Sequence, residues 1–379
     1  MAVAEPIARQ AFVAGRDPGE LARALVDRLA GPGLQIAFVF GDRRLDPRVL
    51  ERAARALPAP VVGCAAAGVI GSRWPGTDPA VVGLGLYGDW LRVGVGVASE
   101  LSRDALTASH DAVNRAAEAL GSTADALEPG RHIAITLIDS RYDREEAFCI
   151  GAAAAAPRIR FVGGCTSTDL DDGEASWVWA DGAARSDAGV VVVLDSDQPF
   201  HAVTSAHLVP TELKTVVTAV SGRTIEQLDG RPAAPRQRQL IASIGGRLDE
   251  PRPSHAFARY LDGVPYVRSL SAVSGDHLIL TCAVEPGHIL RVMQPGDLIG
   301  TTRRDLATAA TRVGGSVAAF LAFSNLARHA EAIARGTDRE LAAIYATCPA
   351  VGFHSISEQS GMLLVNHTLT GLAIGAPKP

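Results

Sequence analysis

The C-terminal stretch Pro349–Gly375, PAVGFHSISEQSGMLLVNHTLTGLAIG, sets polar side chains densely between apolar flanks. One polar cluster runs from His354 to Gln359, and a second cluster, Asn366–Thr368, lies within an apolar run typical of a strand. Buried polar groups cost free energy unless they are paired. We therefore expect these side chains either to satisfy one another or to face a cavity.

The order of elements that leads into this stretch occurs three times in the chain. Each occurrence predicts a strand, a polar turn, a helix, a proline and a short strand that ends in glycine and small or polar residues. These repeat units cover Ile36–Cys64, Ile133–Cys165 and Val317–His354. In the first two, Cys64 and Cys165 follow glycine at what we take to be matching points.

Helix signals accompany the repeat units. Asp17 and Pro18 predict the start of a helix, because aspartate caps helices and proline suits the first helical position. Thr337 and Glu340 have the spacing of a capping box at another helix start. Short segments rich in valine and punctuated by glycine predict further strands between these elements.

Together these patterns predict an α+β protein with mixed sheets covered by helices. The chain of 379 residues is long enough for two domains. The polar, proline-rich stretch 229–239 has the composition of a surface connection. We therefore expect domains at residues 1–232 and 233–379.

Composition excludes several classes of partner. The net charge of −5, without a basic and aromatic run, argues against nucleic acid. Apolar runs such as Gly189–Leu194 are far shorter than the roughly 20 residues that cross a bilayer, and the first residues lack a secretory signal pattern. The cysteines are scattered, which indicates reduced thiols and a cytoplasmic protein: Cys64, Cys149, Cys165, Cys282 and Cys348.

Catalytic motifs are weak. Gly83–Gly88 matches GxGxxG, but a strand pattern follows it where a dinucleotide site requires a helix, so we expect a hairpin. Ser355 and Ser357 lie near His354 and Glu358 in the sequence, which leaves a hydrolase as an alternative. A thiol enzyme that uses Cys64 or Cys165 is a second alternative, although free cysteine is commonly a buried apolar filler.

Histidine leaves another alternative open. His354 and His367 lie in the two polar clusters, and a neutral imidazole is a common ligand of metals and of haem iron. Neither histidine has a second ligand at a spacing typical of zinc. A single axial histidine is enough for haem, so haem binding stands beside imidazoles that simply line a pocket.

Five segments of the chain resemble the FIST family. They are Val62–Cys64, Phe161–Gly164, Thr224–Ala233, Val267–Leu270 and Gly352–Gln359. The resemblance runs from about Gln35 to Gly375 and implies a sensory protein with an N-terminal and a C-terminal FIST domain. The family is associated with bacterial signal transduction, and amino acids and related metabolites are proposed as its ligands. One branch resembles nitric-oxide-sensing haem proteins that regulate histidine kinases.

The sequence departs from the family pattern at three places. The family's Cys followed by Gly-Arg is replaced at Ser324–Arg328, its Thr-Tyr-Gly-Glu at His354–Glu358, and its His-Asn-x-Thr at Val365–Thr368. If the family ligand depends on these positions, this member recognises a different one.

The resemblance and the residue types together predict a site for a zwitterionic metabolite. Glu358 is expected to bind an ammonium group, while Arg268 or Arg328 pairs with a carboxylate. The chain shows no kinase or cyclase domain, so we expect a separate output protein such as a histidine kinase or cyclase. The full candidate set is His354, Ser355, Ser357, Glu358, Gln359, Asn366, His367, Thr368, Arg268, Arg328, Cys64, Cys165 and Thr166.

Overall fold

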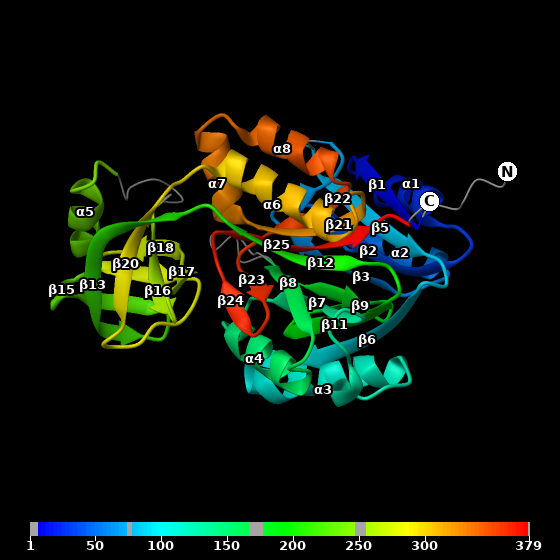
Figure 1. Cartoon of the computed structure of the whole chain (residues 1–379), viewed down its shortest axis with the longest axis horizontal. Coiled ribbons are helices and arrows are strands. Elements are labelled where there is room, and N and C mark those ends of the chain that lie inside the picture. The colour runs from blue at the N-terminus through cyan, green and yellow to red at the C-terminus, as the bar shows by residue number, and fades with distance from the viewer. Residues whose placement is uncertain (1–6, 74–77, 167–176, 247–254, 378–379) are drawn as a thin grey trace.

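A computed structural model describes residues 7–73, 78–166, 177–246 and 255–377. Within these ranges, three mixed sheets with helices on their outer faces form one body, and a further sheet forms a separate lobe (Figure 1). The α+β prediction is confirmed. No helix in the described ranges is long and apolar enough to span a membrane.

The first repeat unit builds a sheet in the order β1-β5-β2-β3. β2 and β3 are parallel, and β5 lies antiparallel between β1 and β2. The bounds are β1 (Ala8–Ala14), β2 (Leu34–Asp42), β3 (Val61–Ala66) and β5 (Ala80–Tyr87).

The second and third repeat units build the same arrangement, in the orders β6-β11-β7-β8 and β12-β25-β21-β22. Again the last two strands of each order are parallel. The predicted threefold repetition is therefore confirmed, and it extends to the flanking strands. The bounds are β6 (Leu91–Ser99), β7 (His132–Asp139), β8 (Arg160–Thr166), β11 (Ala188–Ser196), β12 (Phe200–Ala206), β21 (Val317–Asn325), β22 (Ala350–Ser355) and β25 (Thr368–Gly375).

Helices cover the outer face of each sheet. They are α1 (Pro18–Leu29), α2 (Arg48–Ala56), α3 (Leu101–Ala119), α4 (Glu145–Ala155), α6 (Leu298–Arg312), α7 (Leu326–Ala334) and α8 (Asp338–Thr347). Asp17 caps α1 as predicted, by accepting a hydrogen bond from Glu20 N at 2.7 Å. The capping box at Thr337 was wrong, because its side chain makes no cap bond, and α7 was not predicted.

A glycine at the same strand position in all three repeat units explains why their second strands share a glycine motif. Gly63, Gly163 and Gly352 each lie on the second strand of the parallel pair. A Cβ at these positions would lie 1.7, 2.3 and 1.7 Å from the carbonyl oxygen of the residue opposite on the first strand. Only glycine fits such a close backbone approach.

The register corrects one expectation about the cysteines. Cys64 lies opposite Phe40, and Gly164 lies opposite Leu137 at the equivalent point of the second unit. Cys165 is one residue further along, so the two cysteines do not match. Because successive strand residues point to opposite faces, Cys64 joins the central core while Cys165 joins the core under α3 and α4.

The hairpin expected after the GxGxxG string was also wrong. The strand that follows it is present, but β5 and β6 belong to different sheets. The chain passes from the first repeat unit to the second through this connection, and Gly88 allows the turn with a φ of +107°.

The repeat units exchange strands with one another. β4 (Val69–Ile70) of the first unit pairs with β22 of the third, and β9 (Val178–Ala180) of the second pairs with β3 of the first. β23 (Glu358–Ser360) of the third unit pairs with β8 of the second. The exchange closes a ring in which each unit completes the sheet of a neighbour. β10 (Ala183–Arg185) and β24 (Leu363–Val365) extend two of these sheets.

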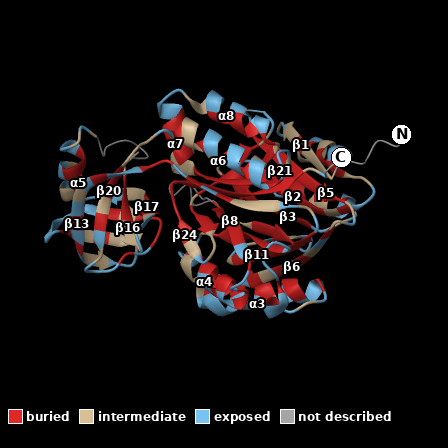
Figure 2. Cartoon of the chain, in the orientation of Figure 1, coloured by how far each residue is buried: buried red, intermediate tan, exposed pale blue. Residues whose placement is uncertain are grey.

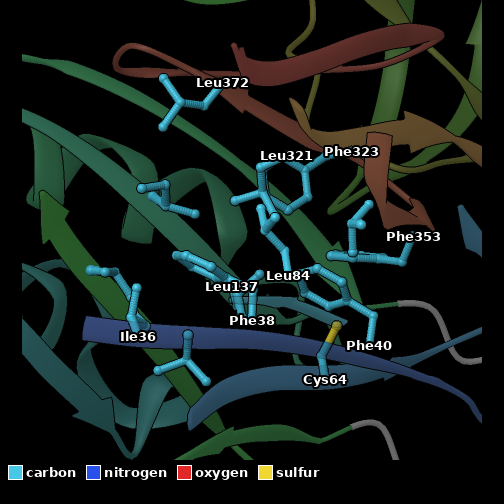
Figure 3. Packing of buried hydrophobic residues seen from close by; sticks show 14 of the residues in the cluster. Ile36, Phe38, Phe40, Cys64, Leu84, Leu137, Leu321, Phe323, Phe353 and Leu372 are labelled. Carbon is cyan, nitrogen blue, oxygen red and sulfur yellow. The ribbon is translucent and has the colours of Figure 1, made fainter. Parts of the chain in front are cut away.

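The inner faces of the sheets share one apolar core. Phe40, Phe323 and Phe353 meet there, with ring centroids 5.1 to 6.4 Å apart, and Cys64 lies beside them (Figure 3). Separate apolar clusters fill the space between each sheet and its helices. Burial is accordingly concentrated in the sheets, while the outer helix faces are exposed (Figure 2).

The separate lobe is inserted into the third unit, between β12 and α6, and has its own apolar cluster (Figure 1). The stretch 229–239 expected as a connection instead forms β15 and most of α5, and the expected boundary at 232/233 lies between these two elements. The lobe comprises β13 (Val209–Ser221), β14 (Thr224–Leu228), β15 (Arg231–Pro232), α5 (Ala233–Ala242), β16 (Ala256–Leu261), β17 (Val264–Arg268), β18 (Leu270–Ser274), β19 (His277–Leu280) and β20 (Ile289–Gln294).

Candidate functional site

The two polar clusters of the C-terminal stretch meet around Glu358, the first residue of β23. Glu358 is fully buried, and each of its carboxylate oxygens accepts hydrogen bonds from neutral donors. Oε1 accepts from Ser355 Oγ at 2.6 Å and from Asn325 Nδ2 at 2.9 Å. Oε2 accepts from Thr368 Oγ1 at 2.6 Å and from Thr368 N at 3.4 Å.

Burial dominates the ionisation of this carboxyl group. Loss of hydration raises the pKa of Glu358 to about 8, although the hydrogen bonds from Ser355, Thr368 and Asn325 act to lower it. In the described part of the chain, no cation pairs with Glu358. The carboxylate oxygens already accept hydrogen bonds from protein donors. Glu358 therefore links the end of β22 to the turn before β25 through these hydrogen bonds.

That turn, Asn366–Thr368, carries one of the contacts between the body and the inserted lobe. Asn366 Oδ1 accepts from Thr281 Oγ1 of the lobe at 2.7 Å and from Ser357 Oγ at 3.0 Å. Its amide Nδ2 donates to Cys282 Sγ at 3.6 Å. All these groups are buried, so the junction is a polar contact enclosed by protein.

His367 occupies a left-handed backbone conformation with a φ of +54°, which is uncommon for a residue other than glycine. Its Nδ1 lies 2.6 Å from Ser269 Oγ of the lobe, and its Nε2 is buried without a hydrogen-bond partner among the described residues. Burial, with the nearby His207 and Arg328, lowers the pKa of His367 to about 3. The imidazole is therefore neutral at physiological pH.

Arg328 lies beside this junction but does not reach Glu358. Its guanidinium is fully buried and donates to Thr302 Oγ1 at 2.7 Å and to Ser205 O at 3.4 Å, with His207 Nδ1 at 3.2 Å. Nε of Arg328 has no hydrogen-bond partner in the described ranges, and the same holds for Nε of the half-buried Arg268. Both arginines thus keep unused donors near the turn.

A second polar contact joins the lobe to α4. Arg223 donates to Glu145 Oε2 at 2.6 Å and pairs with Asp143 at 2.8 Å. Ala283 N donates to Glu146 Oε2 at 2.9 Å. Burial raises the pKa of Glu145 to about 7, with Arg223 opposing that shift. The lobe is therefore held to the body largely by polar groups.

His354 lies apart from Glu358, in the seam between β4 and β22. Its ring stacks on His329 with centroids 4.1 Å apart, and its Nδ1 is buried without a partner among the described residues. Burial lowers the pKa of His354 well below its usual value. The ring lines a cavity of about 20 Å³ with His329, Asp338, Tyr345 and Arg73.

Haem does not fit either histidine in this structure. The cavity beside His354 has space for about one water molecule. His367 is enclosed, with Nδ1 engaged by Ser269. Across the described ranges, no group of three or more His, Cys, Asp or Glu side chains is arranged to hold a metal ion.

The remaining predicted site residues serve other contacts. Gln359 Oε1 accepts from Thr136 Oγ1 at 2.6 Å, and Thr166 O accepts from Ser140 Oγ. Cys64 lies in the central core, and burial raises the pKa of its thiol and of the Cys165 thiol well above the usual value. A raised pKa disfavours the nucleophilic thiolate.

The serines are not arranged as hydrolase nucleophiles. Ser355 Oγ donates to Glu358, and Ser357 Oγ donates to Asn366. The serine that does lie beside a histidine is Ser269, which sequence adjacency did not indicate. Its partner His367 is a weak base because its pKa is so low.

Sequence reasoning missed Asn325, Ser269, Thr281 and Cys282. Asn325 could have been found from the repeat. Asp42, Asp139 and Asn325 each end the first strand of a parallel pair, and each accepts from the backbone N–H two residues on, at 3.0 to 3.1 Å. The lobe residues carry no such signal, because they approach the turn from distant parts of the chain.

The sequence matches one family model, and a solved structure shows a weak similarity to the fold. A family model described as the FIST N domain matches residues 35–231. No curated protein matches the chain. Among solved structures, cyanuric acid hydrolase from A. caulinodans is 13% identical with a TM-score of 0.34, over 98% of this chain and 100% of that one. A TM-score this low carries no argument about function. The family match covers more than half of the chain, which therefore belongs to the FIST family.

Proposed function

We propose that this protein senses an amino acid or a related small metabolite in the cytoplasm. The ligand site lies at the junction between the turn Asn366–Thr368 and the inserted lobe. A separate protein, such as a histidine kinase or cyclase, receives the signal. FIST domains are associated with small-ligand sensing in signal transduction, which supports the general class.

The proposal rests on buried polar atoms at this junction that have no hydrogen-bond partner among the described residues. His367 Nε2, Arg268 Nε and Arg328 Nε are all buried without a partner among the described residues. Buried polar atoms in proteins are almost always hydrogen-bonded, so a cluster of exceptions needs an explanation. A small polar ligand that accepts from the guanidinium groups and contacts the imidazole would supply the missing partners.

The contacts change which residue we expect to bind the ammonium group of the ligand, while the arginines remain the expected partners of its carboxylate. A carboxylate suits Arg268 and Arg328, because guanidinium groups bind carboxylates with two parallel hydrogen bonds. Glu358 has no free lone pair directed at a cavity, since both oxygens accept protein donors. We therefore assign Glu358 to holding the turn, and the ammonium group of a ligand to other acceptors.

Movement of the inserted lobe provides a route from ligand to partner. The lobe has its own apolar cluster and meets the body through polar contacts such as Arg223–Glu145. Domains joined by polar interfaces commonly move relative to one another. A ligand bound between the lobe and the turn would favour one lobe position, and a partner would read that position.

Isothermal titration of the purified protein against the twenty amino acids, one at a time, tests this function. We expect at least one to bind, and His367→Ala and Arg268→Gln to abolish that binding. Asp187→Asn is the matched control, because Asp187 occupies the equivalent turn of the second repeat unit with a φ of +53°. Absence of binding across the panel, together with no small molecule retained in native mass spectrometry, would reject the proposal.

A further inference from the structure

The internal repeat shows that Glu358 is an exception at its position. Glu358 lies opposite Gly164 in the strand exchange, Val69 opposite Phe353, and Val178 opposite Cys64. These three pairings are equivalent in the threefold arrangement. Val69 and Val178 belong to the central apolar core. Two repeat units therefore fill the position with valine, and the third fills it with a carboxyl group.

The surroundings of Glu358 differ from those of the valines in the same way. Ser355 is equivalent to Ala66 and Thr166, because each lies opposite the last residue of the neighbouring first strand. Thr368, the first residue of its strand, is equivalent to Ala80 and Ala188. The third unit is therefore the one with a hydroxyl group at both positions: the first unit has alanine at both, and the second has Thr166 at one and Ala188 at the other.

This set of partners suits both the charged and the neutral carboxyl group. Asn325 Nδ2 and Thr368 N can only donate, and each oxygen of Glu358 receives one of them. The Ser355 and Thr368 hydroxyls can donate to a carboxylate or rotate to accept from a carboxylic acid. A proton can therefore be bound or released at either oxygen without leaving a partner unsatisfied.

Glu358 is connected directly to the proposed ligand site. Its Oε2 binds both the backbone N–H and the hydroxyl of Thr368, which follows His367 in the turn. His367 in turn contacts Ser269 of the inserted lobe. A change in the strength of the bonds to Thr368 therefore acts on the backbone that orients the His367 imidazole.

We propose that Glu358 is a proton-binding positioning residue, whose protonation state sets the affinity of the junction for its ligand. This inference rests on the proposed function, because the readout is binding at that site. Deprotonation strengthens the hydrogen bonds that Thr368 donates, since bonds to an ionised acceptor are stronger. It therefore holds the turn more firmly and raises affinity.

Few titratable groups face Glu358. Cys165 approaches from β8, where the nearby carboxyl group is one cause of its raised thiol pKa. His354 and His367 flank its partners on β22 and on the turn, and both have lowered pKa values, so both are neutral. From β21 the contact is the neutral Asn325. With the pKa of Glu358 near 8, titration falls in the physiological range.

The first arm of the test needs no ligand. Isotope-edited infrared spectroscopy of protein labelled at its glutamate carboxyl groups is expected to show a protonated carboxyl signal above pH 6 that disappears as the pH rises towards 9. Glu358→Gln should remove it. Glu145→Gln identifies the signal of the other buried glutamate with a raised pKa. Absence of any signal that Glu358→Gln removes would overturn the inference.

The second arm measures the affinity of the amino acids that bind, from pH 6 to pH 9. One coupled proton changes affinity by up to about tenfold per pH unit, and we expect affinity to rise with pH in the native protein and to stay flat in Glu358→Gln. Binding with the same pH dependence in both proteins would overturn the inference alone. A titrating carboxyl group, with no amino acid bound and no small molecule retained in native mass spectrometry, would reject the sensor function.

Discussion

The first and third repeat units fill the same buried position with side chains of opposite polarity. At the exchanged strand, the first unit places Val69 against the core, while the third places Glu358 among hydroxyl groups. Replacing buried polar networks with apolar residues of similar volume is often neutral or stabilising. A carboxyl group kept at this position therefore indicates a requirement other than stability, and functional sites are where such local conflicts are expected.

The largest effect should come from placing a glutamate where most of the polar partners are missing. Val178→Glu puts a carboxyl group at the equivalent position of the second unit, which is fully buried. We expect a loss of about 3–5 kcal/mol in the free energy of unfolding, because Thr166 is the one hydroxyl among the equivalents of the Glu358 partners, while Asp139 and Ala188 replace the donors Asn325 and Thr368. Urea denaturation measures this, with the apolar Val178→Met as the control for side-chain length. A loss below about 1 kcal/mol would contradict the comparison.

The pH dependence of stability should separate Glu358 from the valines. Its pKa is raised from 4.5 to about 8 on folding, so the folded state binds the proton more tightly than the unfolded state. Stability from this group is full below pH 4.5 and falls as the pH rises to 8, by up to about 5 kcal/mol. Unfolding curves between pH 5 and pH 9 should show a larger fall in the native protein than in Glu358→Gln, which keeps the fall due to Glu145.

His367 acts in the opposite direction. Its pKa is lowered to about 3, so its contribution is full above pH 6.5 and is lost as the pH falls towards 3. In His367→Asn this acid-side loss should be smaller, while the decline above pH 5 due to Glu358 remains. Equal acid sensitivity in the two proteins would show that His367 is not buried as a neutral group.

Replacing three residues of the third unit with their equivalents from the first unit should give an apolar core at this position. The triple variant Glu358→Val, Ser355→Ala and Thr368→Ala reproduces Val69, Ala66 and Ala80. We expect a gain of about 1–3 kcal/mol above pH 8, where the native carboxyl group is ionised, together with loss of ligand binding. Denaturation and titration calorimetry on the same preparation test both parts. Loss of stability with retained binding would reverse our interpretation.

The smallest effect concerns the backbone of the turn. His367→Gly relieves a left-handed conformation but removes the hydrogen bond to Ser269. Each contribution is about 1 kcal/mol, so stability should change by less than about 1 kcal/mol. Ligand affinity should nevertheless fall, because the imidazole is lost. Asp187→Gly in the second unit provides the matched control, with stability measured by denaturation and affinity by calorimetry.

The sequence by itself determined the local elements. The α+β class, the threefold strand-helix-strand order and the aspartate cap of α1 could all be predicted, because periodicity and capping depend on neighbouring residues. The glycine of the repeated motif was visible too, although its reason, a close carbonyl on the adjacent strand, was not. These features are encoded within short windows of the chain.

Tertiary structure decided how those elements combine. A one-residue difference in register separates Cys64 from Cys165, and strand pairing alone fixes that register. The partners of the turn, Ser269 and Thr281, are 98 and 85 residues from His367 and Asn366 in the chain. Burial, rather than residue type, raises the pKa of Glu358 and lowers that of His367. Because desolvation and long-range pairing arise only when the chain is packed, the sequence could name these residues but not their chemistry.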